Sequence, residues 1–243
     1  DCLNSLIDHT IHLHYEISII DNGTTDNSID FIKNNYPNVI LIQNKKNRGV
    51  AAGRNQGIRV ARGRYIAFLD ADTVLQNNAF KHLVDFMEAN PAAGLAGAKL
   101  LSPEGRLQYS CRKFPTVYSK VLRRMPFGDI LVEDELYVTW DHNEARCMDY
   151  VIGAAQIIRR SVIEKIGLLD EHIFYGPEDI DYCLRVWKAG WKVYYVPDAL
   201  IVHYEQRITK KIWSKITFLH IWGLVYFFMK HGYFFKRPGF NNV

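Results

Sequence analysis

Short apolar runs alternate with longer amphipathic stretches throughout residues 16–101 of the chain. The runs, each closed by polar or turn-forming residues, lie at 16–21, 38–44, 64–70 and 94–101. The intervening stretches, which have helical composition or spacing, lie at 27–37, 49–63 and 78–90. Because the runs are apolar on both faces and alternate with helices, they predict an α/β fold whose parallel sheet is covered on both sides.

The second half of the chain is patterned differently. Residues 102–148 mix aromatic, basic and acidic positions without clear periodicity, which predicts long loops with room for a hairpin. Residues 149–167 predict a strand followed by a short helix, and residues 178–190 predict a helix that ends at a glycine. Residues 191–204 predict one strand, or two strands interrupted by Pro197.

Composition narrows the class of protein. The 243 residues are 48% hydrophobic and 23% charged, which is enough apolar material for a large core and too little charge for global disorder. The formal net charge of +4 gives no reason to expect a nucleic-acid partner. The four cysteines are scattered, without a CxxC pair or metal-finger spacing, and this indicates a reduced, cytosolic chain.

Two acids interrupt the pattern at the end of the run 64–70. Asp70 and Asp72 lie at the carboxyl end of a predicted strand, the edge where open parallel sheets bind ligands. Side chains at i and i+2 of an extended chain point the same way, so these carboxylates repel each other unless a cation such as Mg²⁺ or Mn²⁺ lies between them. The alternative is structural: Asp72 or Thr73 caps the helix that begins near Asn77.

A second acidic pair, Glu178 and Asp179, opens the predicted helix at 178–190. One explanation is electrostatic, because the helix dipole favours acids at a helix N-terminus by roughly 0.3–1 kcal/mol. A carboxylate at the rim of a cleft is also suited to act as a general base. Both interpretations stay open on these residues alone.

Two further features belong with the acids. Arg48 and Arg54 flank small residues at a predicted helix start, where backbone amides and guanidinium groups can approach a phosphate. The stretch is not a Walker loop, because GxxxxGK[ST] is absent. His203 lies near the end of a predicted strand, where a lone histidine is either a structural residue or a ligand.

The order of these motifs resembles that of the family 2 glycosyltransferases of the GT-A fold. The matching segments, which run through most of residues 16–204, are IIDNGTTDNS, NRGVAAGRNQGIRVARGRYIAFLDADT, VIGAAQIIRRSVIEKIGLLDEHIFYGPEDIDYCLRVWKAGWKV and VPDALIVHY. The segment GRLQYSCRKFPT also resembles the bacterial branch that contains rhamnosyltransferase-like enzymes. The ordered set is more specific than any one piece.

The resemblance implies a mostly parallel central sheet flanked by helices, with a C-terminal helical tail. It divides the chain into a glycosyltransferase domain at 1–208 and an aromatic, basic extension at 209–243. Nothing before Asp1 matches the family's first strand, and the opening DCLNSL resembles the helix that follows that strand. The start also lacks the features of a signal peptide. We therefore expect that an opening segment is missing from this sequence.

The resemblance also implies roles on the donor side. Asp21 matches the acid that contacts the nucleobase, and Arg54 matches an arginine of the donor pocket. Asp70 and Asp72 match the family's DxD motif, whose second acid binds a metal ion on the donor diphosphate. The first acid of that motif supports the metal and the donor. His203 matches a position that reaches the metal or the diphosphate, and the implied cofactor is Mg²⁺ or Mn²⁺.

On the acceptor side, Gly153 and Ala154 match small residues that line the sugar and acceptor site. Asp179 matches the family's catalytic base, with Glu178 beside it. The implied reaction is inverting transfer of a sugar from a nucleotide-diphosphate sugar to a hydroxyl of a glycan or lipid-linked acceptor, in bacterial cell-surface polysaccharide synthesis. The alternatives are a non-catalytic nucleotide- or sugar-binding module of the same fold, and a sugar-phosphate nucleotidyltransferase.

The tail is aromatic and basic. Its apolar stretch, 216–229, is shorter than the ~20 residues that a membrane helix needs, and lysines flank it. Such a helix can lie in a membrane interface, which would place the protein on the inner, cytoplasmic face of the cell membrane. The alternative is a core helix or the contact of a homodimer.

Overall fold

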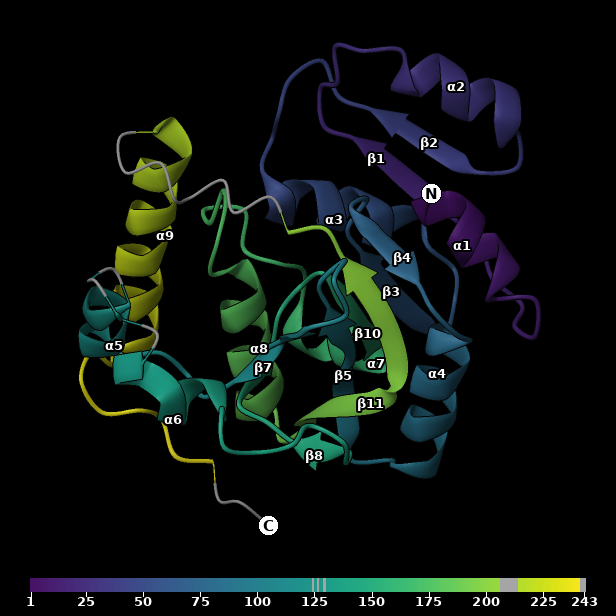
Figure 1. Ribbon diagram of the computed structural model, residues 1–243. Helices are drawn as coiled ribbons and strands as arrows, with labels where there is room; N and C mark the ends of the chain where they lie inside the picture. The colour runs from purple at the N-terminus through teal and green to yellow at the C-terminus, as the bar shows by residue number, and fades with distance from the viewer. Residues whose placement is uncertain (124, 126, 129, 206–213, 241–243) are drawn as a thin grey trace.

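The structure is a computed structural model of the 243-residue chain (Figure 1). It describes residues 1–123, 125, 127–128, 130–205 and 214–240. The predicted boundary between domain and tail, at 208/209, lies outside the described residues, and so do the first residues of the tail.

The elements follow the predicted order. Those of the first half are α1 (Cys2–Asp8), β1 (Ser18–Asp21), α2 (Ser28–Asn35), β2 (Ile40–Gln43), α3 (Val50–Val60), β3 (Tyr65–Leu69), β4 (Thr73–Leu75), α4 (Ala79–Ala89) and β5 (Ala93–Leu101). Those of the second half are β6 (Leu107–Gln108), β7 (Cys111–Arg112), α5 (Val117–Leu122), η1 (Ile130–Val132), α6 (Glu133–Leu136), β8 (Arg146–Cys147), β9 (Tyr150–Val151), β10 (Ala155–Arg159), α7 (Arg160–Ile166), α8 (Glu178–Lys188), β11 (Lys192–His203) and α9 (Lys215–His231). Every predicted helix and strand of residues 16–101 is present, and β4 is an addition.

The central sheet has seven strands and is mixed rather than mostly parallel. Its main path runs β3-β10-β5-β11-β4, with β6 beside β5 and β8 beside β11. Along this path, β5 and β11 pair in parallel, whereas β10 runs antiparallel to β3 and β5, and β4 runs antiparallel to β11. An apolar run indicates burial on both faces but not strand direction, so the insertion of β10 from the second half was not predictable from the pattern.

The first two strands form a separate parallel sheet, β1–β2. Helix α3 packs against it, because a side chain at Gly53 or Gly57 would lie 3.8 Å from Ile20. Ala51 and Ala52 of the same helix are buried. Gly53, one of the small residues suggested for phosphate approach, therefore lies at the contact between α3 and β1.

Apolar layers cover both faces of the central sheet, with α4 on one side and α8 on the other (Figure 1). Leu83 and Met87 of α4 are buried against one face. Leu184 of α8 belongs to the opposite layer, to which α9 adds Phe227 and Phe228. The tail helix is therefore a core helix along one of its sides.

The last strand and the last helix settle two local predictions. β11 is a single strand whose pairing with β5 becomes irregular between Val196 and Leu200, so Pro197 disturbs the register without ending the strand. Helix α9 has 17 residues. Within the described parts of the chain, no helix combines the length and apolar character needed to cross a membrane.

Candidate active site

The turn between β3 and β4 carries the first acidic pair. Asp70 and Asp72 lie in this turn rather than on an extended strand. The Asp70 amide donates to the Ala154 carbonyl at 2.9 Å, and the Thr73 hydroxyl donates to the Asp70 carbonyl at 2.7 Å. Helix α4 begins only at Ala79, beyond β4, so neither Asp72 nor Thr73 caps it and the capping alternative is wrong.

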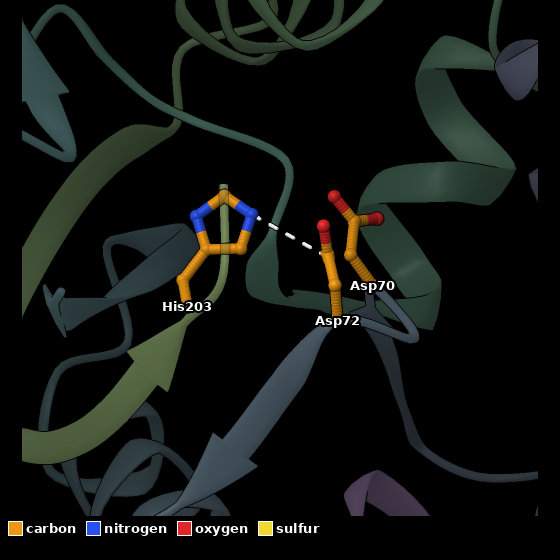
Figure 2. A group of neighbouring side chains, drawn as sticks. All are labelled: Asp70, Asp72 and His203. Atoms are coloured by element: carbon orange, nitrogen blue, oxygen red, sulfur yellow. Dashed lines mark ion pairs between the residues drawn. The ribbon is translucent and has the colours of Figure 1, made fainter. Parts of the chain in front are cut away.

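Strand register brings His203 to this turn. β11 and β4 pair with His203 opposite Thr73, so the last residue of β11 lies beside Asp72. The His203 Nε2 is 3.5 Å from Asp72 Oδ1, and Figure 2 shows the imidazole and both carboxylates close together. One ligand atom each from Asp70, Asp72 and His203 lies within 4.8 Å of the others. Residues from distant parts of the chain thus form one cluster.

Gln108 orients the histidine and was not predicted from the sequence. Its Nε2 donates to the His203 backbone carbonyl at 2.8 Å, while its Oε1 lies 3.0 Å from His203 Nδ1. An amide oxygen accepts hydrogen bonds, so this contact assigns the proton to Nδ1 and leaves the lone pair of Nε2 facing Asp72. Gln108 lies within the segment GRLQYSCRKFPT, but nothing in that segment singles it out, because its place beside His203 depends on the pairing of β6 with β5.

The donor set of this cluster fits a divalent cation. Two carboxylates and an imidazole nitrogen suit Mn²⁺ and accommodate Mg²⁺. The side chains of Asp70 and Asp72 are 43% and 27% exposed, which leaves room for phosphate oxygens or water. Burial and the neighbouring Asp70 raise the pKa of Asp72, and a protonated His203 would oppose the rise. A bound cation would favour the ionised form of both acids.

Arg54 connects this cluster to the second acidic pair. Its Nη2 donates to Asp70 Oδ1 at 3.1 Å and to the Gly153 carbonyl at 2.9 Å, and its Nη1 lies 3.5 Å from Glu178 Oε1. Only 11% of the Arg54 side chain is exposed. Burial alone would lower the pKa of Arg54, but the carboxylates of Asp70 and Glu178 raise it. The guanidinium is therefore a fixed positive charge between two acids.

Gly153 and Ala154 lie directly against these groups. A Cβ atom at Gly153 would stand 2.4 Å from Arg54 Nη1, so only glycine admits the guanidinium in its present position. The next residue, Ala154, is buried and supplies the carbonyl that binds the Asp70 amide. The loop before β10 thus shapes the site through backbone atoms.

The second acidic pair is buried at the start of α8. Glu178 and Asp179 are 7% and 9% exposed. Asp179 accepts hydrogen bonds from the amides of Gly153 (3.0 Å) and Ile180 (2.7 Å), and Glu178 accepts one from the Gly176 amide (2.8 Å).

The surroundings of this pair change its acidity. Burial and the neighbouring Asp179 raise the pKa of Glu178 to about 7, although Arg54 opposes them. Burial also raises the pKa of Asp179. A carboxylate with a raised pKa takes up a proton more readily and is better suited to general-base catalysis near neutral pH.

Asp21 lies apart from these groups, at the end of β1. Its Oδ1 accepts hydrogen bonds from the amides of Gly23 and Thr24 at 3.1 and 2.8 Å. Its neighbour Asn22 donates to the Gly49 carbonyl at 3.0 Å and so ties this strand end to the start of α3. Among the described contacts, none joins Asp21 to the cluster, and its role at the nucleobase stays a prediction.

Comparison with known families decides the class of this protein. The protein-family model described as "Glycosyl transferase family 2" matches residues 1–167. The chain belongs to glycosyl transferase family 2. This assignment confirms the predicted family and enzyme class, and it argues against the nucleotidyltransferase alternative. The matched residues include Arg54, the Asp70–Asp72 turn and Gly153, whereas Asp179 and His203 lie beyond them.

Bacterial proteins share sequence similarity with this family 2 chain. An N-acetylglucosaminyl-diphospho-decaprenol L-rhamnosyltransferase of Mycobacterium tuberculosis is 26% identical over 212 residues, covering 79% of this chain and 67% of the relative. The dTDP-rhamnosyl transferase RfbF of Shigella flexneri is 26% identical over 204 residues, which cover 83% of this chain and 64% of RfbF. The chain therefore spans about two thirds of these relatives, and the resemblance to rhamnosyltransferases is confirmed as a similarity.

Solved structures show the same fold. A mannosyltransferase, PcManGT of Pyrobaculum calidifontis, solved with GDP-Man and Mn²⁺, superposes with a TM-score of 0.61 over 97% of this chain and 60% of its own, at 20% identity. GalNAc-T7, crystallised with UDP, GalNAc and Mn²⁺, superposes with a TM-score of 0.64. The superposition covers 96% of this chain and 51% of GalNAc-T7, at 17% sequence identity. These similarities confirm the predicted GT-A fold for this family 2 glycosyltransferase.

Proposed function

We propose that this glycosyltransferase binds a nucleotide-diphosphate sugar with the help of Mg²⁺ or Mn²⁺ and transfers the sugar, with inversion, to an acceptor hydroxyl. The observation that carries the proposal is the position of Arg54. It contacts Asp70 of the cation cluster and Glu178 of the buried pair, and both it and Asp179 bind Gly153. A cation site and a candidate base are thereby held in one connected group.

On the donor side, Asp70, Asp72 and His203 would hold the cation, and Arg54 adds a fixed positive charge beside it. A cation held by these residues would offset the charge that develops on a departing diphosphate. Asp21 is proposed to contact the nucleobase, as the family resemblance implies. The partly exposed carboxylates leave the donor's phosphates free to approach.

On the acceptor side, Asp179 is proposed to take the proton of the acceptor hydroxyl, with Glu178 beside it and Gly153 and Ala154 lining the space. The hydroxyl oxygen then forms a bond to the anomeric carbon while the bond from that carbon to the diphosphate oxygen breaks. The electron pair of the broken bond stays on the diphosphate. A single displacement of this kind inverts the anomeric centre.

The proposed substrates follow the named relatives. We propose a rhamnosyl or other hexosyl donor and a glycan or lipid-linked acceptor of bacterial cell-surface polysaccharide synthesis, since one relative is named for a decaprenol-linked acceptor and another for a dTDP-linked donor. The proposed location is the cytoplasmic face of the cell membrane. Four free cysteines agree with a reducing compartment.

A thermal-shift screen of nucleotide-diphosphate sugars, with and without Mn²⁺, tests this proposal. A true donor at 100-fold excess over its Kd should raise the midpoint by roughly 5 °C or more, and only with the cation. Incubation with an acceptor should then release the nucleoside diphosphate. Binding without release in any acceptor mixture would favour the non-catalytic module, and the absence of any Mn²⁺-dependent shift would contradict the proposal.

A further inference from the structure

Most of the large apolar side chains that stay exposed in the described structure belong to two regions. One comprises α5 and the residues that follow it, and the other comprises α9 and the residues that follow it. We name as the apolar face six of these side chains, each more than half exposed: Tyr118, Val121, Phe127, Phe218, Trp222 and Met229. Apolar surface concentrated in this way marks an interaction site.

Helix α9 is apolar all around but covered on one side only. Leu224 and Phe227 are buried in the core beside α8. Phe218, Trp222 and Met229, spaced at i, i+4 and i+11, lie 60–70% exposed on the other side. A helix that is apolar on both sides needs a cover for each, so this stripe lacks a partner in the isolated chain.

The two regions are joined to each other by hydrogen bonds. The Val117 amide at the start of α5 donates to the Phe234 carbonyl at 2.8 Å, just beyond the end of α9. Arg237 Nε donates to the Phe114 carbonyl at 2.7 Å and adds a second link. Figure 1 shows α5 beside the lower part of α9, at the edge of the molecule away from α4. The apolar face is therefore built on both helices together.

The exposed charges beside this surface are basic. Neither α5 nor α9 contains an acidic residue, and Lys215 at the start of α9 and Lys236 beyond its end are exposed, whereas Lys230 is paired with Asp170 and Asp181. A symmetric contact between two copies would bring these exposed lysines onto the same basic surface of the partner copy. An anionic lipid surface would instead attract them while the aromatic and aliphatic side chains enter the headgroup region.

The same helix packs against the turn that holds the candidate base. A Cβ atom at Gly176 would stand 1.8 Å from His220 Nδ1, and one at Gly223 would stand 3.2 Å from Pro177 Cδ. Gly176 and Pro177 lead directly into the acidic pair of α8. A surface that docks through the outer side of α9 would thus lie on the far side of the helix that packs against the turn before Glu178 and Asp179.

We infer that the apolar face docks the protein onto an anionic lipid bilayer, with α5 and α9 lying in the interface. The inference rests on the proposed function only for its purpose, which is to present the site to a lipid-linked acceptor. Binding to the bilayer itself requires neither donor nor cation. The surface on α5 was not predicted from the sequence, which singled out only the tail.

Co-sedimentation of the full chain with vesicles tests the inference. Vesicles of phosphatidylcholine with phosphatidylglycerol should bind the wild type, and phosphatidylcholine alone should bind it less. The pairs Trp222→Ser with Met229→Ser, and Tyr118→Ser with Val121→Ser, should each weaken partitioning by about tenfold or more, because they remove buried apolar area from the interface. Phe31→Ser, a 57% exposed position on α2, is the matched control and should bind like the wild type.

Three results would overturn the inference. One is the absence of wild-type binding to anionic vesicles, and another is equal loss of binding in Phe31→Ser and the face variants. The third is a dimer in sedimentation velocity that the face variants dissociate, because it would assign the surface to a second copy. Calorimetry with donor and Mn²⁺ on the same samples separates this inference from the proposed function, since the face variants should bind donor like the wild type.

Discussion

The two acidic pairs of this protein consist of similar residues, yet the fold places them in opposite surroundings. Asp70 and Asp72 stand in an open turn, with 43% and 27% of their side chains exposed and His203 facing them. Glu178 and Asp179 are almost fully buried and accept hydrogen bonds from backbone amides. The first pair is accessible to a cation and phosphate, and the second is held in place with a raised affinity for protons.

The comparison shows that acidity and access, rather than residue type, separate a cation site from a candidate base. Arg54 lies between the pairs and contacts one acid of each. It offsets part of the negative charge on both sides, which allows four carboxylates to share a small volume. Changes that alter one pair and leave the other in place should therefore have distinct effects.

The largest effect is expected at Asp179. Asp179→Asn removes the proposed base, so transfer should slow by at least about 100-fold. The fold should be kept at a cost of about 1–3 kcal/mol, because asparagine keeps only one of the two oxygens that accept the amides of Gly153 and Ile180. Steady-state release of nucleoside diphosphate measures the transfer rate, and the midpoint of thermal unfolding measures the stability of the fold.

Asp181, two residues further along α8, is the matched control. It is fully buried and paired with Arg185, Lys230 and His231. Asp181→Asn should cost about 3 kcal/mol of stability, because Arg185, Lys230 and His231 lose the buried carboxylate that they share, while the folded protein keeps its transfer rate. Wild-type turnover in Asp179→Asn would exclude Asp179 as the base.

The next effect concerns the first pair through its neighbour Gln108. Gln108→Leu removes the acceptor that sets the proton on His203 Nδ1, so affinity for Mn²⁺ should fall by about 10- to 100-fold. Electron paramagnetic resonance of free Mn²⁺ during a titration measures this directly. Gln76→Leu, at an exposed position, should bind Mn²⁺ like the wild type, and equal affinities in all three proteins would remove Gln108 from the site.

A smaller effect is expected at the link between the pairs. Gly153→Ala places a methyl group 2.4 Å from Arg54 Nη1, which must move away from Asp70 or Glu178. Because the end of a long side chain can shift, stability should change little, while kcat/KM should fall by about tenfold. Gly239→Ala, where a Cβ meets nothing within 4 Å, is the control. Unchanged kinetics in Gly153→Ala would mean that the position of Arg54 is not critical.

The last effect concerns stability alone and is a pH dependence that comes from the buried pair. The folded protein holds a proton on Glu178 up to a pKa of about 7, whereas the unfolded chain releases it near 4.5. Stability should therefore decline as the pH rises from about 4.5 to about 7, by on the order of 3 kcal/mol. Urea unfolding at pH 5 and pH 8 measures it, and Glu178→Gln should show a smaller decline. Equal declines would contradict the raised pKa.

The sequence predicted the local surroundings of both pairs but not the distant residues that approach them. The Asp70–Asp72 turn and the start of α8 follow from apolar runs and turn residues, so both pairs were found with their local surroundings. The capping alternative failed because β4 is only three residues long and gives no periodic signal. The approach of His203 depends on the antiparallel register of β4 and β11, which no local pattern specifies.

The link through Arg54 was equally hidden, because it joins residues of α3, the β3–β4 turn, the loop before β10 and α8. Sequence placed Arg54 near a phosphate but not between two acids. The mixed direction of the sheet was missed for the same reason, since burial patterns indicate which strands are central and not how they run.

A calorimetric titration of donor with Mn²⁺ into Asp72→Asn and Asp179→Asn, side by side, tests the division of roles between the two pairs most directly. Asp72→Asn should lose Mn²⁺-dependent donor binding, because it removes a cation ligand. Asp179→Asn should bind donor like the wild type and yet fail to transfer the sugar. Wild-type donor binding in Asp72→Asn, or loss of donor binding in Asp179→Asn, would contradict the assignment of cation and base to separate pairs.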